Sequence, residues 1–463
     1  MKKIAFFCIP AHGHTNPMLP VAAELVKRGD KVRFYSFNEF EEKIKATGAE
    51  FINCDRFLPE ITKEEEQALK NIKTTEMTIQ DIRITLSMND FLEDEFKTFK
   101  PDVVYTDSVC FWGKLNARKF DVPMVVSTST FAFNRLSSKY MKYQKGELRD
   151  MIFGLPRISK ELKTLEPYGY KVKSAMSLVQ NDNKTDTNVY TSRGFQPYAE
   201  SFSDLYNFVG PSVFSSAKPQ KEKQRPLVYI SLGTVINERP DFYNKCIEAL
   251  KDLKLDVIIS CGKALDKKLL GVLPENVKVY SYVDQLDVLS KADVFITHCG
   301  MNSVSESLYM ATPMVLYPQT SEQYAVAKRT AEIGAGEQLT DDSAVGIKAA
   351  VERILGNSVY QKAAAKQGAE FRACGGVKVA ADYIESAPHK SNGIDVLEEL
   401  KKSTAKFQFC YLTIVAAIIV LFGIFIGWNF VWIIGVSAGV LSAPVVKALE
   451  GKMYKSIVKR KVK

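Results

Sequence analysis

A strand, a glycine turn and a helix start follow one another after residue 293, and this order constrains the fold more than any other feature. Asp293–Thr297 (DVFIT) has the β-branched and aromatic content of a short buried strand. The turn His298-Cys299-Gly300 follows, and Asn302-Ser303 then opens a helical pattern. α/β proteins build anion sites in this order, because free backbone N–H groups and the positive end of the helix dipole face the ligand. The stretch therefore predicts an α/β protein with an anion site at this strand end.

The side chains around this turn are of kinds that can hold a sugar nucleotide. His298, Asn302 and Ser303 add hydrogen-bond donors where a diphosphate would lie. Glu306 stands one turn further along the same helix face, where it could accept a hydrogen bond from a ribose hydroxyl. Glu322-Gln323 follow the next short strand, and a carboxylate beside an amide suits the vicinal hydroxyls of a sugar.

The stretch from Tyr282 to Gln323 resembles the donor-binding box of family 1 glycosyltransferases, which use a UDP-activated sugar. The runs H-C-G-M-N-S-x-x-E, T-P-M and E-Q match that box at its spacings, and the sequence of the stretch is most similar to the macrolide-type bacterial branch. The resemblance implies that Tyr282 stacks on the base, that Gln285 lies near the ribose and that Gln323 favours glucose. The strand-end turn after PLVYIS suits phosphate or the domain cleft. The predicted donor-binding set is Ser231, Gly233, Thr234, Tyr282, Val283, Gln285, His298, Gly300, Asn302, Ser303, Glu306, Glu322 and Gln323.

The start of the chain predicts a βαβ unit and a candidate general base. A buried strand begins at residue 3, a helix is expected from about Pro17 to Arg28, and the strand KVRFYS follows. There is no GxGxxG, which argues against a nicotinamide cofactor. His14 follows the first strand and Asp107 follows the strand VVYT, so both lie at strand ends where open α/β sheets bind ligands.

Imidazole titrates near neutrality, so a histidine at this place can take a proton from an acceptor hydroxyl while a carboxylate orients the ring. The resemblance implies that His14 is this base and Asp107 its partner. The residues alone leave His12 open as the base, and they show no third ligand for a metal held by His12 and His14. No metal ion is expected.

Cysteine usage and charge exclude two classes of protein. The eight cysteines are scattered without a CxxC pair, which indicates reduced thiols and no disulfide framework. The net charge of +9 is concentrated in the last residues: 447–463 hold seven lysines and arginines against Glu450. The remainder is near balance, which argues against a nucleic-acid partner.

Pattern and resemblance together predict a GT-B fold, in which two Rossmann-like domains with parallel sheets face each other. The helix Val377–Ser386 is expected to close the second domain, and the resemblance implies that the last helices cross back to the first. The expected organisation is an acceptor-binding domain 1–211, a linker 212–226, a UDP-sugar-binding domain 227–387, an amphipathic juxtamembrane segment 388–408, two transmembrane helices within 409–446 and a basic cytosolic tail 447–463.

The predicted membrane segment rests on the run from Phe407 to Val446, which carries no charge. One helix of that length would be about 60 Å long, against roughly 30 Å of hydrocarbon, so two passes are expected: Phe409–Gly427 and Phe430–Val446. Lysines flank both ends, which by the positive-inside rule favours a multi-pass membrane protein with its catalytic domains in the cytoplasm.

The function expected from these features is an inverting, metal-independent transfer of a hexose from a UDP-sugar. UDP-glucose is the expected co-substrate, and the acceptor is expected to be a hydroxyl of a hydrophobic small molecule or lipid. Two alternatives come from other classes: a nucleotide-sugar epimerase or hydrolase on the same fold, and a non-catalytic membrane-tethered protein that binds UDP-sugars. Dependence on an acceptor separates the first alternative from transfer, and the presence of both His14 and Asp107 disfavours the second.

Overall fold

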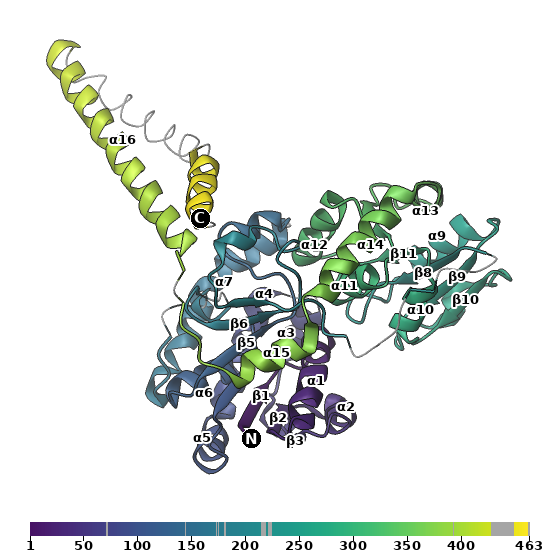
Figure 1. Cartoon of the computed structure of the whole chain (residues 1–463), viewed down its shortest axis with the longest axis horizontal. Helices are drawn as coiled ribbons and strands as arrows, with labels where there is room; N and C mark the ends of the chain where they lie inside the picture. Colours follow the sequence, from purple (N-terminus) through teal and green to yellow (C-terminus); the bar gives the residue numbers. More distant parts are fainter. Residues whose placement is uncertain are drawn as a thin grey trace. The chain divides into compact units, whose positions relative to one another are not determined.

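The chain folds around two β-sheets, each packed against helices (Figure 1). The computed structural model describes residues 1–70, 73–143, 145–172, 174, 176–179, 182–213, 219–220, 225–391, 393–426 and 449–461. Most of the expected linker, Ser212–Pro226, lies outside the described residues.

The first sheet has seven strands among the described residues, in the order β3-β2-β1-β4-β5-β6-β7. Every neighbouring pair from β3 to β6 is parallel. The strand order reverses between β1 and β4, which creates a crevice at the carboxyl ends of these two strands. The strands are β1 (Lys3–Phe7), β2 (Lys31–Ser36), β3 (Glu50–Asn53), β4 (Val103–Asp107), β5 (Met124–Thr128), β6 (Asp186–Val189) and β7 (Tyr206–Phe208). The helices of this part are α1 (His12–Lys27), α2 (Glu41–Lys45), α3 (Lys63–Lys70), α4 (Thr74–Ser87), α5 (Asn89–Thr98), α6 (Phe111–Lys119), α7 (Lys145–Lys163) and α8 (Met176–Val179).

The second sheet is parallel throughout its described strands, in the order β10-β9-β8-β11-β12-β13. Its order reverses between β8 and β11, so the predicted donor-binding turns after these two strands share one edge of the sheet. The strands are β8 (Leu227–Ser231), β9 (Asp256–Ser260), β10 (Val277–Tyr280), β11 (Val294–Thr297), β12 (Met314–Leu316) and β13 (Gly336–Gln338). The helices are α9 (Pro240–Leu250), α10 (Gln285–Lys291), α11 (Met301–Tyr309), α12 (Ser321–Glu332), α13 (Ala344–Gly356), α14 (Ser358–Ala373), α15 (Gly376–Glu385) and α16 (Val396–Ile426).

Helix α15 follows the second sheet in sequence but packs into the core of the first. Its Ala380, Ala381 and Ile384 are fully buried among residues of β1, α1, β2 and β4. At the surface of the same contact, Nη1 of Arg28 at the end of α1 lies 2.6 Å from a carboxylate oxygen of Asp382. Figure 1 shows α15 beside α1. The crossing back of the chain that the resemblance implied is therefore present, and the expectation that the helix Val377–Ser386 closes the second domain is wrong.

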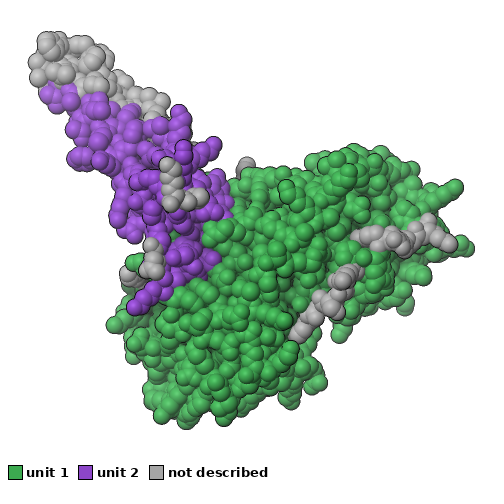
Figure 2. All heavy atoms as spheres, in the orientation of Figure 1, with its two compact units in different colours: residues 1–197, 207–389 green, residues 198–206, 390–463 purple. Residues whose placement is uncertain are grey.

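The described residues divide into two compact units, coloured green and purple in Figure 2. Unit 1 (residues 1–197 and 207–389) contains almost all of both sheets. Unit 2 comprises residues 198–206 and 390–463. Within unit 2, Nζ of Lys461 donates to the carbonyl of Phe202 at 2.6 Å, and Arg460 pairs with Glu399 of α16 at 2.9 Å.

The predicted transmembrane hairpin, and with it the multi-pass membrane localisation, is corrected by the structure. No helix among the described residues has the length and apolar character that crossing a bilayer requires. Residues 409–426 of the first predicted span are the continuation of α16, a single helix whose first turns carry Glu398, Glu399 and further charged side chains. The prediction considered only the uncharged run and divided this helix at residue 408. The second predicted span, Phe430–Val446, lies outside the described residues.

Candidate active site

His14 and Asp107 are brought together at the crevice of the first sheet. Helix α1 begins at His12, five residues before the predicted start, so His14 lies in its first turn directly after β1. Asp107 is the last residue of β4, the strand beside β1. Nδ1 of His14 lies 2.8 Å from Oδ2 of Asp107, and the other carboxylate oxygen of Asp107 accepts from the backbone N–H of Val109 at 2.9 Å. Asp107 is completely buried, whereas the His14 side chain keeps 22% of its surface exposed.

The surroundings of His14 stabilise its protonated form. Burial acts to lower the pKa of His14, but the charge and the hydrogen bond of Asp107, with the charges of Glu322 and Asp81, outweigh it and raise the pKa to about 8. The hydroxyl of Ser129 lies 3.3 Å from the same ring nitrogen. Because Nδ1 faces Asp107, Nε2 is the nitrogen left to exchange a proton with a ligand.

His12, the alternative base, has different surroundings. Its Nε2 pairs with Glu39 at 2.8 Å, and the two side chains are 30% and 60% exposed. Its ring meets Phe40 edge to face. Among the residues that the structure describes, no buried carboxylate orients the His12 ring, so the geometry favours His14 over His12.

His298 is held tightly between two glycines at the edge of the second sheet. A Cβ on Gly233 would lie 2.6 Å from His298 Nε2, and one on Gly300 would lie 2.5 Å from the same atom. Gly233 also has a φ of 78°, which favours glycine. Burial lowers the pKa of His298 to about 4, against the opposing effect of a hydrogen bond with the backbone of Ser231. The ring is therefore neutral at physiological pH, and its buried Nδ1 has no hydrogen-bond partner among the described residues.

Helix α11 begins where the anion site was predicted. Gly300 is its N-cap and supplies no side chain to the free backbone N–H groups of the first turn. The side-chain amide of Asn302 donates to the backbone carbonyl of Gly13 at 2.9 Å. This bond joins the predicted diphosphate side chains to the residue beside His14, so the edges of the two sheets meet here.

Three of the predicted ribose and phosphate side chains form one hydrogen-bonded cluster. The amide nitrogen of Gln285 donates to Glu306 at 2.6 Å and lies 3.3 Å from the Ser303 hydroxyl. Burial raises the pKa of Glu306 to about 7, although the bond from Gln285 opposes the rise. Tyr282 is 79% exposed, and Val283 packs against the core beneath the cluster. Among the described residues, Tyr282 makes no hydrogen bond and no ring contact.

Glu322 and Gln323, at the start of α12, have different surroundings. Burial raises the pKa of Glu322, the charge of His14 opposes this rise and the charge of Asp107 adds to it, so Glu322 is within electrostatic range of the pair. The side-chain oxygen of Gln323 instead accepts from the backbone N–H of Gln319 at 2.8 Å and forms a capping box with Thr320. The prediction gave Gln323 only a sugar contact, and the spacing Thr320-x-x-Gln323 was the signal of this cap.

The turn after β8 supports the donor edge through its backbone. Ser231 is 6% exposed, and its hydroxyl lies 3.4 Å from the backbone nitrogen of Gly233. The amide of Asn237 donates to the carbonyl of Gly233 at 2.8 Å. Thr234 is exposed. The turn therefore presents Ser231 and Gly233 to the His298 ring and leaves Thr234 toward solvent.

Two charged residues near the catalytic crevice were not predicted. The charges of Asp107 and His14 act on the carboxyl group of Asp81 in α4, whose pKa burial raises. Lys114 in α6 is 1% exposed. Asp81 could not be predicted, because nothing in the local sequence shows that α4 packs against α6 and α7.

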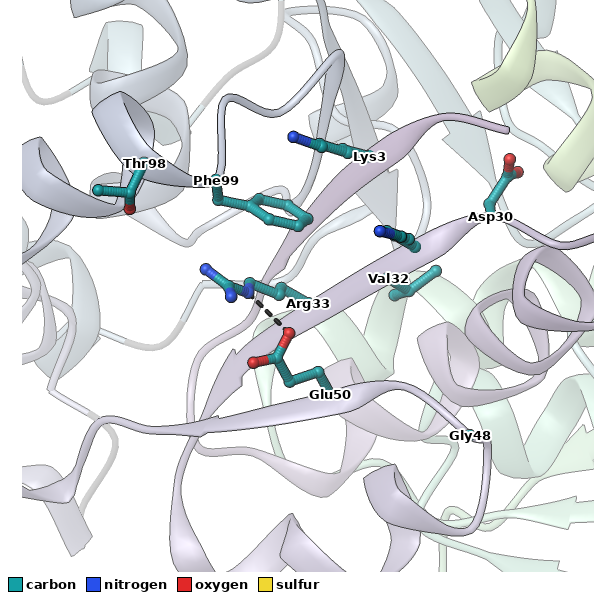
Figure 3. Close-up of a pocket in the computed structure, with 9 residues that line it drawn as sticks. Lys3, Asp30, Val32, Arg33, Gly48, Glu50, Thr98 and Phe99 are labelled. Carbon is teal, nitrogen blue, oxygen red and sulfur yellow. Dashed lines mark hydrogen bonds and ion pairs between the residues drawn. The ribbon is translucent and has the colours of Figure 1, made fainter.

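A separate pocket of about 590 Å³ lies at the opposite edge of the first sheet (Figure 3). It is lined by residues at the beginnings of β1 and β2, with Phe99 and Glu50 on its walls. Arg33 points toward Glu50 across it, at 2.7 Å. Because ligands of α/β sheets bind at the carboxyl ends of the strands, this pocket is not the candidate active site.

Comparison with known proteins now decides the family. A family model described as UDP-glucoronosyl and UDP-glucosyl transferase matches residues 217–369. The NDP-glycosyltransferase YjiC of Bacillus licheniformis is 34% identical over 405 residues, which cover 83% of this chain and 97% of that protein. The chain belongs to the UDP-glycosyltransferase family.

Further relatives of this glycosyltransferase support the same family and fold. The demethyllactenocin mycarosyltransferase of Streptomyces fradiae is 32% identical over 401 residues, covering 83% of this chain and 86% of that protein. The crystal structure of CalG4, the calicheamicin glycosyltransferase, matches with a TM-score of 0.68 at 27% identity, covering 84% of this chain and all of that one. The predicted enzyme class, macrolide-type relatives and GT-B arrangement of two Rossmann-like sheets are confirmed. Enzymes of this family use a nucleotide sugar as co-substrate and work without a metal ion.

Proposed function

We propose that this glycosyltransferase moves a hexose from a UDP-sugar to a hydroxyl of a hydrophobic small molecule with inversion at the anomeric carbon. The observation that carries the proposal is the arrangement around His14: the buried carboxylate of Asp107 holds Nδ1 of the imidazole, and the charge of Glu322, a predicted sugar-binding carboxylate, acts on the same ring. The relatives named for demethyllactenocin and for calicheamicin support a small molecule as the acceptor class. Glucose is the sugar favoured by Gln323.

On the acceptor side, Nε2 of neutral His14 takes the proton of the acceptor hydroxyl as its oxygen attacks the anomeric carbon. Asp107 holds Nδ1 and stabilises the imidazolium that forms. The oxygen–carbon bond forms as the bond from that carbon to the diphosphate breaks, so the electron pair leaves with UDP.

On the donor side, charge develops on the departing diphosphate. The free N–H groups at the start of α11 and the side chains of His298, Asn302 and Ser303 are placed to stabilise it. A neutral His298 donates through one ring nitrogen, which suits a diphosphate oxygen. The Gln285–Glu306 pair would receive the ribose, and Tyr282 would stack on the base.

The test uses purified protein with UDP-glucose, and with dTDP-glucose in a parallel arm. Release of the nucleoside diphosphate is followed with and without a panel of phenolic and macrolide acceptors, with EDTA present. Release that requires an acceptor and survives EDTA is expected. Release or epimerisation without an acceptor would identify a hydrolase or epimerase, and a faster reaction with dTDP-glucose would overturn the UDP assignment.

Substitution of Gly300 tests the donor site directly. Gly300→Ala places a Cβ 2.5 Å from His298 Nε2, so the ring or the start of α11 must move. A displaced ring loses its hydrogen bond to the charged diphosphate, which is worth about 1.5–3 kcal/mol, so UDP should bind roughly ten- to a hundredfold more weakly in calorimetry. Gly356→Ala is the matched control, because a Cβ there meets nothing within 4 Å. Equal UDP affinity in the two variants would remove His298 from the donor site.

A further inference from the structure

Lys114 is a buried cation beside the catalytic pair with no role in the proposed chemistry. It lies in the first turn of α6 and is 1% exposed. Burial lowers the pKa of its ammonium group to about 8, against the opposing charge of Asp107. Lysine is rarely buried to this extent unless its charge is compensated. Its place in the structure therefore calls for an explanation beyond packing.

The ammonium group joins two segments that are distant in sequence. Nζ donates to the backbone carbonyl of Ser108 and, at 2.8 Å, to the carbonyl of Leu178 in α8. Ser108 directly follows Asp107. Leu178 is completely buried in an apolar cluster with Ile79, Ile82 and Phe111. One side chain thus ties the turn that carries Asp107 to the helices that pack beside it.

The neighbouring glycine explains how Lys114 reaches this place. A Cβ on Gly113 would lie 2.2 Å from the hydroxyl of Thr106 and 2.7 Å from Cβ of Phe7. Only glycine therefore lets the first turn of α6 approach β4 and β1 this closely. The approach brings Lys114 under the turn at residues 107–109, where Val109 N–H already holds one oxygen of Asp107.

We propose that Lys114 is a positioning residue for glycosyl transfer: it fixes the Asp107 turn against α8, so that Asp107 holds the His14 ring in the orientation that the base requires. The proposal rests on the proposed function, because it gives Lys114 an effect only through the His14–Asp107 pair. Two carbonyl groups aimed at one ammonium group fix a turn more firmly than an apolar side chain could, because their hydrogen bonds are directional and charge-assisted.

The test is Lys114→Met, which keeps the length and apolar stem of the side chain and removes its donors. We expect kcat to fall about 10- to 100-fold, since small misplacements of catalytic groups have effects of this size, while UDP affinity stays unchanged. The acid limb of kcat/KM should move to higher pH, because a cation near Asp107 is lost and the imidazolium of His14 gains stability. Other titratable groups around Lys114 are Arg118, Cys110 and Asp182, which the substitution leaves in place.

The matched control is Lys119→Met on the same helix, whose Nζ contacts Asn89 and Glu93 away from the crevice. It should leave kcat and the pH profile unchanged. Lys114→Arg keeps the charge and the donors of the side chain, so it should restore part of the kcat that Lys114→Met loses. If the methionine variant does not fold, the arginine variant is compared with the wild type instead. Wild-type kcat and pH profile in Lys114→Met would overturn the positioning role, as would equal losses in the arginine and methionine variants. Failure of the proposed function is distinguishable, because the wild type would then show no acceptor-dependent release of UDP.

Discussion

Replacing His14 by alanine should lower kcat by about 10²- to 10⁴-fold, the range that general-base catalysis supplies. The variant should bind UDP as the wild type does, because His14 contacts none of the donor side chains by a hydrogen bond among the described residues. The loss should therefore appear in kcat, with little change in the KM for the UDP-sugar. Single-turnover kinetics with saturating UDP-glucose measure it directly.

The chain offers a close control for this substitution. His12 lies two positions away at the start of the same helix, but its partner is the exposed Glu39. His12→Ala should retain activity within a few-fold of the wild type. If His12→Ala were the inactive variant and His14→Ala the active one, the choice of base would be reversed.

Replacing Asp107 by asparagine should lower kcat by about 10²- to 10⁴-fold as well, because an amide can donate to Nδ1 and favour the wrong tautomer of His14. In the wild type, kcat/KM should fall as the pH drops through about 8, since His14 becomes protonated and can no longer accept a proton. In the variant the carboxylate that raises this pKa is gone and burial still lowers it. The acid limb of the residual activity should therefore move to lower pH, opposite to the shift expected for Lys114→Met.

Asp102→Asn is the control for this prediction. Asp102 directly precedes β4, at the end of the strand opposite Asp107, where it accepts from the backbone N–H of Lys3 at 2.7 Å. It should leave both kcat and the pH profile unchanged. An acid limb that stays near pH 8 in Asp107→Asn would show that another group controls the protonation of His14.

Much of the fold could be predicted because its strands are short, buried and followed by recognisable turns. His14 and Asp107 lie at the ends of β1 and β4 in the first sheet, and His298 follows β11 in the second. A parallel sheet brings the carboxyl ends of its strands to one edge. The sequence pattern therefore predicted that these residues lie at strand ends, and the resemblance supplied the pairing of His14 with Asp107. The choice of His14 over His12 needed either the resemblance or the structure, because both histidines lie in the first turn of the same helix.

The missed features depend on packing between distant segments. Lys114 reaches the Asp107 turn only because Gly113 lets α6 approach β4, and Asp81 comes within electrostatic range of Asp107 only through the packing of α4. No local pattern encodes either arrangement. The prediction of a membrane hairpin was wrong for another reason. It considered the run Phe407–Val446 without the charged first turns of α16, the helix to which the first part of the run belongs. The domain boundaries and the roles of the site residues stay predictions.

The return of α15 to the first sheet has a consequence for protein engineering. Recombining halves of two glycosyltransferases to change the donor would naturally exchange everything after the linker. Such a chimera would carry a foreign α15 into a core completed by Ala380, Ala381 and Ile384. A compatible chimera needs two crossover points, one in the linker and one just before Gly376, so that the acceptor half keeps its own closing helix.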